Sequence, residues 1–206
     1  MSNENTENWQ TLVREQQFNQ LLIEWNSKIN LVSRKKPNVF DLIEDSKIFM
    51  EGMDLTPGMN ILDLGTGGGF PGIVLAIHHP DVNFVLVDSI QKKITVVSDI
   101  IKRMELTNAR AICSRAEELA KADSPFLKGV EGGFANSFNY VVSRSVAVLQ
   151  DLCLWSKDLI KPGAKLIALK GGDISGEIRK TRKLSFVKDV YRKVFDERIL
   201  VIVEFF

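Results

Sequence analysis

The sequence is poor in the residues that build metal and redox centres. It has two cysteines and two histidines among 206 residues. Cys113 and Cys153 belong to no CxxC or Cys/His cluster, so neither a metal site nor a redox pair is expected. His78 and His79 directly precede Pro80, a position typical of a helix end. No Ser/His/Asp or Cys/His catalytic set is apparent.

Long apolar runs are also missing. No stretch approaches the ~20 apolar residues of a membrane-spanning helix. The opening MSNENTENWQ lacks the basic and then apolar pattern of a signal peptide. Hydrophobic residues still make up 45% of the chain, enough for one α/β domain with an added segment. We therefore expect a cytoplasmic protein with reduced thiols and no membrane partner.

Neither sign of charge is in large excess, because the formal net charge is +1. The distribution is nevertheless uneven. Residues 1–55 carry 6 Lys/Arg against 9 Asp/Glu, whereas residues 161–206 carry 11 Lys/Arg against 6 Asp/Glu. RKTRK at 179–183 holds four positive charges, which predicts either a solvated helix face or a contact with RNA.

Apolar residues recur at helical spacing near the N-terminus. They predict a helix over residues 9–32 that docks on the rest of the chain in preference to a partner. The stripe comprises Phe18, Leu21, Leu22, Trp25, Ile29 and Val32. A second short helix is expected at residues 39–50. We therefore predict an N-terminal helical segment, 1–55, packed on a core domain of residues 56–206.

Strand and helix patterns alternate after residue 56, which predicts a parallel sheet with right-handed crossovers. The expected strands are residues 60–64, 84–88, 109–114, 139–145 and 164–170, the last after a KPG turn at 161–163. Residues 184–195 and 199–206 flank a short DER turn and predict a terminal antiparallel hairpin. The segment 123–138 has no period and is expected to form a surface loop.

NILDLGTGGGFPG, residues 60–72, places a glycine-rich turn after a buried strand and predicts a nucleotide-like ligand. A triphosphate loop needs GxxxxGK[ST], but Ile73 and Val74 follow the last glycine, so this ligand is excluded. A dinucleotide loop needs GxGxxG, and Phe70 stands where its third glycine is required. The dinucleotide remains an alternative on the glycines alone.

S-adenosylmethionine is the third ligand. DLGTGGG, which begins at Asp63, resembles the first motif of class I methyltransferases, D/E-x-G-x-G-x-G. Asp63 would face the amino-acid end of this cofactor, directly or through water. Gly65 and Gly67 would let it approach the backbone without a Cβ clash, and Gly69 completes the motif.

The ends of the next two strands add further positions. Asp88, 23 residues after Gly65, can accept both hydroxyls of an adenosine ribose from either cofactor. Ala116 and Glu117 follow the third strand, where class I methyltransferases meet the adenine. The C-terminal hairpin favours S-adenosylmethionine, because class I methyltransferases append a reversed strand and dinucleotide-binding domains do not.

The residues after the fourth strand indicate the target atom. Enzymes that methylate exocyclic base amines often carry [DN]PP[FY] at this place, where this chain has SRSV, residues 143–146. The sequence therefore does not favour an exocyclic amine as the target. Cys153 is expected in a helix core rather than as the nucleophile of a pyrimidine C5 enzyme. A ring nitrogen with a free lone pair, such as guanine N7, needs no proton removed before attack. Positioning and desolvation can then suffice without a general base.

Seven segments of the chain share the order and spacing of one known family. They are WNSKINLVS (25–33), EDSKIF (44–49), LGTGGGFPGI (64–73), LVDSIQKK (86–93), SRAEE (114–118), VVSRS (141–145) and ALKG (168–171). Together they resemble the bacterial small-subunit (16S) rRNA guanine-N7 methyltransferases, also called glucose-inhibited division protein B (GidB). The resemblance covers nearly the whole chain from about Phe18, including a Phe-Pro-Gly extension that the general class I motif lacks.

The resemblance implies a fold, a cofactor and a substrate. The fold is a class I α/β fold, in which a mostly parallel, Rossmann-like seven-stranded sheet ends in an antiparallel hairpin and helices precede it. The activity is transfer of a methyl group from S-adenosylmethionine to guanine N7 of 16S rRNA, free or in the small ribosomal subunit, by a monomer. A class I methyltransferase with a small-molecule or protein substrate is the alternative.

The resemblance also assigns residues by position. The cofactor positions are Gly65, Phe70, Ala116, Glu117 and Arg144, with Asp88 facing the ribose. Arg144 can hold the cofactor carboxylate or a substrate phosphate, and Lys170 is a second candidate for positioning RNA, together with the run at 179–183. The chain departs from the family pattern at three positions, where it has Leu42 for His, Ile199 for His and Glu204 for Lys.

Overall fold

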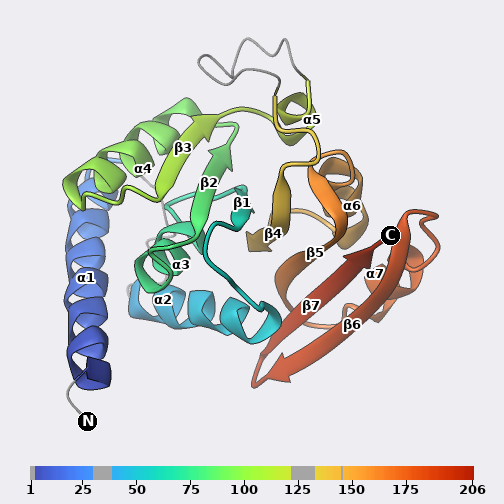
Figure 1. Ribbon diagram of the computed structural model, residues 1–206, viewed down its shortest axis with the longest axis horizontal. Coiled ribbons are helices and arrows are strands. Elements are labelled where there is room, and N and C mark those ends of the chain that lie inside the picture. Colours follow the sequence, from blue (N-terminus) through green and yellow to red (C-terminus); the bar gives the residue numbers. More distant parts are fainter. Residues whose placement is uncertain (1–2, 30–38, 122–132, 145) are drawn as a thin grey trace.

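A seven-stranded sheet forms the centre of the computed structural model, which describes residues 3–29, 39–121, 133–144 and 146–206, with side chains from residue 9 onward (Figure 1). The strand order is β3-β2-β1-β4-β5-β7-β6. The strands are β1 (Asn60–Leu64), β2 (Asn83–Asp88), β3 (Ala109–Cys113), β4 (Phe138–Arg144), β5 (Ile160–Gly171), β6 (Val187–Phe195) and β7 (Arg198–Phe205). β1 to β5 pair in parallel, whereas β7 is antiparallel to both β5 and β6. The predicted fold class is thereby confirmed.

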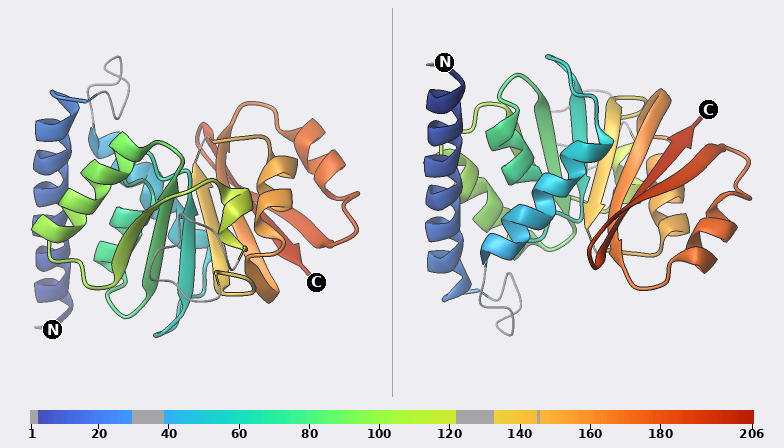
Figure 2. Two further views of the ribbon diagram at one scale, coloured as in Figure 1. Left: turned by 90° about the horizontal axis from the view of Figure 1, so that it is seen from above. Right: turned by 90° about the horizontal axis from the view of Figure 1, so that it is seen from below.

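Helices cover both faces of this sheet (Figures 1 and 2). One layer is formed by α2 (Val39–Lys47), the 3-10 helix η1 (Ile48–Gly52), α3 (Gly72–His78) and α4 (Gln91–Arg103). The other layer is formed by α5 (Ala116–Leu119), α6 (Leu149–Ser156) and α7 (Ser175–Thr181). Successive strand residues point to opposite faces, and along β1 Ile61 joins the first core whereas Leu62 and Leu64 join the second. None of the described helices is long and apolar enough to cross a membrane.

Helix α1 (Asn3–Asn26) packs outside the first layer, against α3 and α4 (Figure 2). The apolar stripe explains the contact, because Phe18 and Leu22 are fully buried in the core that α3 shares. Val32 lies outside the described residues. The division into an N-terminal helical segment of residues 1–55 and a core domain of residues 56–206 stays a prediction.

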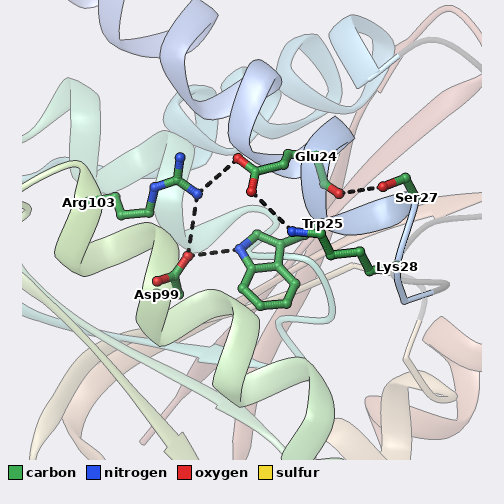
Figure 3. Close-up of polar contacts among 6 residues, drawn as sticks. All are labelled: Glu24, Trp25, Ser27, Lys28, Asp99 and Arg103. Atoms are coloured by element: carbon green, nitrogen blue, oxygen red, sulfur yellow. Dashed lines mark hydrogen bonds and ion pairs between the residues drawn. The ribbon is translucent and has the colours of Figure 1, made fainter.

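Hydrogen bonds and ion pairs join the C-terminal end of α1 to α4 (Figure 3). Trp25 Nε1 donates to Asp99 Oδ2 at 2.8 Å. Arg103 pairs with Glu24 at 3.0 Å and lies 3.7 Å from Asp99, so one cation serves both helices. These exposed pairs contribute little stability individually, but they fix the direction in which α1 crosses α4.

A buried carboxylate joins α1 to two other helices. Glu15 is 4% exposed, and its Oε1 lies 3.0 Å from Lys47 Nζ on α2 and 2.7 Å from His78 Nε2 on α3. A carboxylate only accepts, so His78 Nε2 carries the hydrogen in this contact. Because a buried charge without partners is costly, both partners favour one docked position of α1.

Two expectations about connecting segments are wrong in part. Residues 123–132 lie outside the described part of the chain, but Phe134 and Phe138 are only 4% and 1% exposed, and Phe138 begins β4. Residues 133–136 form a turn in which Ala135 and Asn136 are exposed, as expected of a surface loop, but Phe134 anchors this turn to the core and Phe138 belongs to β4. Residues 161–163 are not a turn before β5, because β5 already begins at Ile160. The pairing of β5 with β4 is irregular at these residues, since Phe138 pairs with Ile160 and Tyr140 pairs with Lys165.

The docking of α1 can be tested by truncating its most buried aromatic residue. We predict that Phe18→Ala lowers the free energy of unfolding by about 3–5 kcal/mol, because it removes a fully buried ring that contacts Phe70. Ile23→Ala, on the same helix but 55% exposed, should change it by less than about 0.5 kcal/mol. Urea denaturation measures both variants, and equal effects would show that α1 does not fold with the core.

Candidate active site

A cavity of about 530 Å³ opens at the carboxyl ends of β1 to β4. In open α/β sheets, ligands bind outside this edge. Most of the residues predicted for the cofactor line the cavity, namely Gly65, Gly67, Phe70, Asp88, Ala116, Glu117 and Arg144. Asp63 and Gly69 do not line it, and neither does Lys170. The structure therefore brings together positions that lie up to 79 residues apart in the sequence.

The glycine loop needs its glycines because neighbouring groups approach closely. Gly65 has a φ of +77°, and a Cβ there would lie 2.4 Å from a methyl carbon of Val146. A Cβ at Gly72 would lie 2.6 Å from Asp63 Oδ2 and 2.7 Å from Leu86 Cγ. Any larger residue at either position would move the cavity wall or the first turn of α3.

Asp63 lies beneath this loop and is fully buried. Its Oδ2 accepts the Gly72 N–H at 2.9 Å, which ties the end of β1 to the start of α3. Its Oδ1 has no hydrogen-bond partner among the described residues. Burial raises the pKa of Asp63 to about 7, although the nearby Thr66 hydroxyl, the Gly72 N–H and the positive charge of Arg144 oppose the rise.

Asp88 organises the adjoining wall of the cavity. It is 7% exposed and accepts three donors, which are Gly67 N at 3.1 Å, Ile90 N at 3.0 Å and Lys93 Nζ at 3.2 Å. These contacts connect the glycine loop, the end of β2 and the first turn of α4. A carboxylate offers about four lone-pair positions, so one acceptor position on Oδ1 remains open.

Arg144, at the end of β4, lies between a ring and a carboxylate. Its guanidinium carbon stands 5.2 Å from the centre of the Phe70 ring, a cation–π contact. Its Nη1 lies 3.9 Å from Asp45 Oδ2, and Arg198 Nε donates to the other Asp45 oxygen at 2.9 Å. The buried Nε of Arg144 has no partner among the described residues. Burial lowers the pKa of Arg144, and the nearby Asp45 and Asp63 carboxylates oppose this.

Sequence reasoning missed several residues of the site. Asp45 had a signal, since it belongs to the EDSKIF segment, but its role beside two arginines depends on contacts of α2 with both β4 and β7. Ile90 and Lys93 also line the cavity and belong to the LVDSIQKK segment, but no site role was assigned to them. Trp155 lines the cavity and belongs to none of the seven segments. A single aromatic residue in a helix such as α6 has no sequence feature that separates a cavity wall from a core position.

Lys170 does not have a free side chain. Its Nζ donates to the Ala147 carbonyl oxygen and pairs with Glu177 Oε2 at 3.1 Å, and its side chain is only 11% exposed. By contrast, Arg179, Lys180, Arg182 and Lys183 in and after α7 are all accessible to solvent to a greater degree. A contact between Lys170 and RNA would first require these two bonds to break.

The three departures from the family pattern lie outside the cavity lining, although Ile199 pairs with Lys170 at the cavity end of the sheet. Leu42 is buried in the core that α2 shares with α1 and α3. Ile199 packs against the core on the opposite face. Glu204 pairs with Lys165 at 3.2 Å and lies 3.8 Å from Lys188, at the end of the sheet opposite the cavity. None of the three lines the cavity.

The chain is similar to proteins of one known family. The family model described as rRNA small subunit methyltransferase G matches residues 12–198. The chain belongs to this family. Ribosomal RNA small subunit methyltransferase G of Chlorobium phaeobacteroides is 43% identical over 162 residues, which cover 78% of this chain and 67% of the relative. The protein of that name from Desulforamulus reducens is 37% identical over 180 residues, or 86% and 70% of the two chains.

Solved structures agree with the family at the level of the fold. A SAM-dependent methyltransferase from Aquifex aeolicus superposes with a TM-score of 0.59 at 16% identity, over 83% of this chain and 94% of that one. A ribosomal protein L11 methylase from Lactobacillus delbrueckii subsp. bulgaricus also gives 0.59, at 14% identity, over 80% and 78%. The rRNA small subunit methyltransferase G family thus shares its sheet architecture with methyltransferases whose sequences have diverged widely.

The buried carboxylate of Asp63 makes stability depend on pH. Because its pKa of about 7 is above the ordinary 3.8, the folded chain holds a proton that the unfolded chain has released between about pH 4 and pH 7. We predict that the free energy of unfolding of the native chain falls as the pH rises from about 4 to about 7, measured relative to Asp63→Asn, whose side chain does not titrate. Urea denaturation at several pH values measures the difference. Parallel profiles would show that Asp63 titrates normally.

Proposed function

We propose that this chain binds S-adenosylmethionine in the cavity at the glycine loop and transfers its methyl group to guanine N7 of 16S rRNA. Family membership supports the methyltransferase activity and the rRNA substrate. The observation that carries the cofactor assignment is the single cavity shared by Gly65, Gly67, Asp88, Ala116 and Arg144. A monomeric, cytoplasmic enzyme is part of this proposal.

The polar groups of the site fit the cofactor. The open acceptor position on Asp88 Oδ1 suits one ribose hydroxyl. A second hydroxyl can bind Oδ2 once the contact between Lys93 Nζ and this oxygen is broken. The amino-acid end carries an ammonium and a carboxylate. Arg144 lines the cavity, so its guanidinium can pair with the carboxylate. Asp63 lies beneath the glycine loop and outside the cavity lining, so its open Oδ1 would meet the ammonium through a bridging water.

The chemistry that we propose needs no general base. When bound, S-adenosylmethionine supplies an electrophilic methyl group. Guanine N7 could accept this methyl group with its ring lone pair, and the carbon–sulfur electron pair would remain on the cofactor sulfur, so no residue of the chain would have to remove a proton from the base. Phe70 and Val146 would exclude water beside the reacting atoms, and Arg144 would fix the orientation of the cofactor.

The substrate side of the proposal rests on charge. The cations in and after α7 can contact phosphates, which position an RNA without reading its sequence. Acidic side chains are fewer there, since residues 161–206 carry 11 Lys/Arg against 6 Asp/Glu. Binding should therefore weaken steeply as salt concentration rises.

The role of Asp88 is testable by calorimetry without RNA. We predict that Asp88→Asn weakens binding of S-adenosylmethionine by about 1.5–3 kcal/mol, because the ribose loses hydrogen bonds to a charged acceptor. Asp81→Asn, an exposed carboxylate in the connection before β2, should leave affinity unchanged. If both variants bind as the native chain does, Asp88 does not hold the ribose.

The substrate is tested in cells by mapping N7-methylguanine in rRNA from a strain that lacks the gene. We expect one mark in 16S rRNA to disappear and to return when the native gene is supplied, but not when Asp88→Asn is supplied at limiting cofactor. Survival of every such mark would contradict the proposed substrate. RNA-independent methylation of a protein or small molecule by the purified chain would support the alternative substrate classes.

A further inference from the structure

Lys170 and Glu177 form a junction that connects β5, α7 and residues 146–149 at the start of α6. Lys170 Nζ donates to the Ala147 carbonyl at 2.5 Å and lies 3.1 Å from Glu177 Oε2. Their side chains are 11% and 29% exposed, respectively. Such a pair is screened less by water than an exposed ion pair, so the junction can hold its three parts at fixed separation.

Glu177 also caps helix α6. Its Oε2 accepts the N–H of Leu149, the first residue of α6, at 2.7 Å. The residue before the helix is Val148, whose side chain cannot accept a hydrogen bond. A carboxylate brought from α7 therefore replaces the local capping side chain and suits the positive end of the helix.

The segment held by this junction forms part of the cavity wall. Val146 lines the cavity, is 41% exposed, and fills the space that a Cβ on Gly65 would need. Ala147, the next residue, accepts the bond from Lys170. Lys170 and Glu177 therefore hold Val146 in place beside the glycine loop through their bonds to Ala147 and Leu149.

We propose that Lys170 and Glu177 are positioning residues for methyl transfer, and this rests on the proposed function. Their junction keeps the Val146 wall aligned with α7. The same helix carries Arg179 and Lys180, which precede Arg182 and Lys183. An RNA held by these cations then presents its target base to the cavity at a fixed distance, although neither Lys170 nor Glu177 contacts the RNA.

Direct binding of RNA phosphate by Lys170 makes opposite predictions. Removing a phosphate contact weakens RNA binding and lowers the slope of log K against log salt by about one. Removing the negative charge of Glu177 would then strengthen RNA binding. If the two residues act as a junction, both substitutions should instead impair the same step in the same direction, with little change in RNA affinity.

The test compares Lys170→Met and Glu177→Gln with Lys165→Met. The control breaks a Lys–Glu pair on the same strand, at the end opposite the cavity. We expect each junction variant to lower kcat with 16S rRNA on the order of tenfold, while the dissociation constant for RNA changes less than about threefold and the salt slope is unchanged. The double variant should be no worse than either single variant. Lys165→Met should keep its kcat.

Hydrogen exchange supplies a readout that needs no activity. In the Lys170→Met variant we expect faster exchange in peptides covering residues 146–152, and unchanged exchange in β1 and α3. This result would stand even if the proposed substrate were wrong. A salt slope reduced by about one, tighter RNA binding by Glu177→Gln, or an unchanged kcat in both junction variants would overturn the proposal. Glu177→Gln keeps an acceptor for Leu149 N, so it remains informative if Lys170→Met does not fold.

Discussion

The contact between Asp63 and Gly72 is the constraint on which the site depends. A carboxylate at the end of β1 is fully buried and accepts the N–H of the first residue of α3, where a side chain would collide with it. The glycine loop between Asp63 and Gly72 must therefore make a tight turn. That turn creates the backbone wall of the cavity, with Asp63 below it and Asp88 fastening its other side.

A second set of charges joins the site to the layers around it. Asp45 on α2 holds Arg198 and lies beside Arg144, so the first helical layer, the central strand β4 and the C-terminal strand β7 meet at one carboxylate. Across the sheet, Glu177 and Lys170 tie α7 and β5 to the start of α6. The cavity thus lies between two ionic junctions, one on each face. Because both are partly buried, they can fix geometry more effectively than exposed pairs.

Local patterns predicted much of this structure. β1 matches the predicted residues 60–64, and β2 and β3 lie within one residue of prediction, because buried parallel strands form short apolar runs bounded by turn residues. Helix α7 was not assigned, since a seven-residue helix with glycine and three charged residues has no clear apolar period. Its stability comes from packing on α6 and from Glu177, and neither contact can be read from local sequence.

The candidate site was predicted unevenly for the same reason. Gly65, Asp88, Ala116 and Arg144 stand in motifs and were found. Asp45 and Lys93 also stand in such segments, but their roles depend on tertiary contacts and were not predicted. Trp155 lies outside the segments and was not found. Lys170 was a candidate for positioning RNA because ALKG matches the family pattern, but its ammonium is bound to the Ala147 carbonyl and to Glu177. The position of a residue at a strand end can be predicted from local sequence. The partners of its side chain cannot, because they lie on other elements.

The most direct test of the account is methyl transfer with purified components. The chain would be incubated with methyl-labelled S-adenosylmethionine and either 16S rRNA or small subunits from cells lacking the gene. The digested nucleosides would then be separated by mass. The account predicts that the label appears in N7-methylguanosine of 16S rRNA at one position. Label in another nucleoside, or no transfer to either substrate by a chain that binds the cofactor, would contradict it.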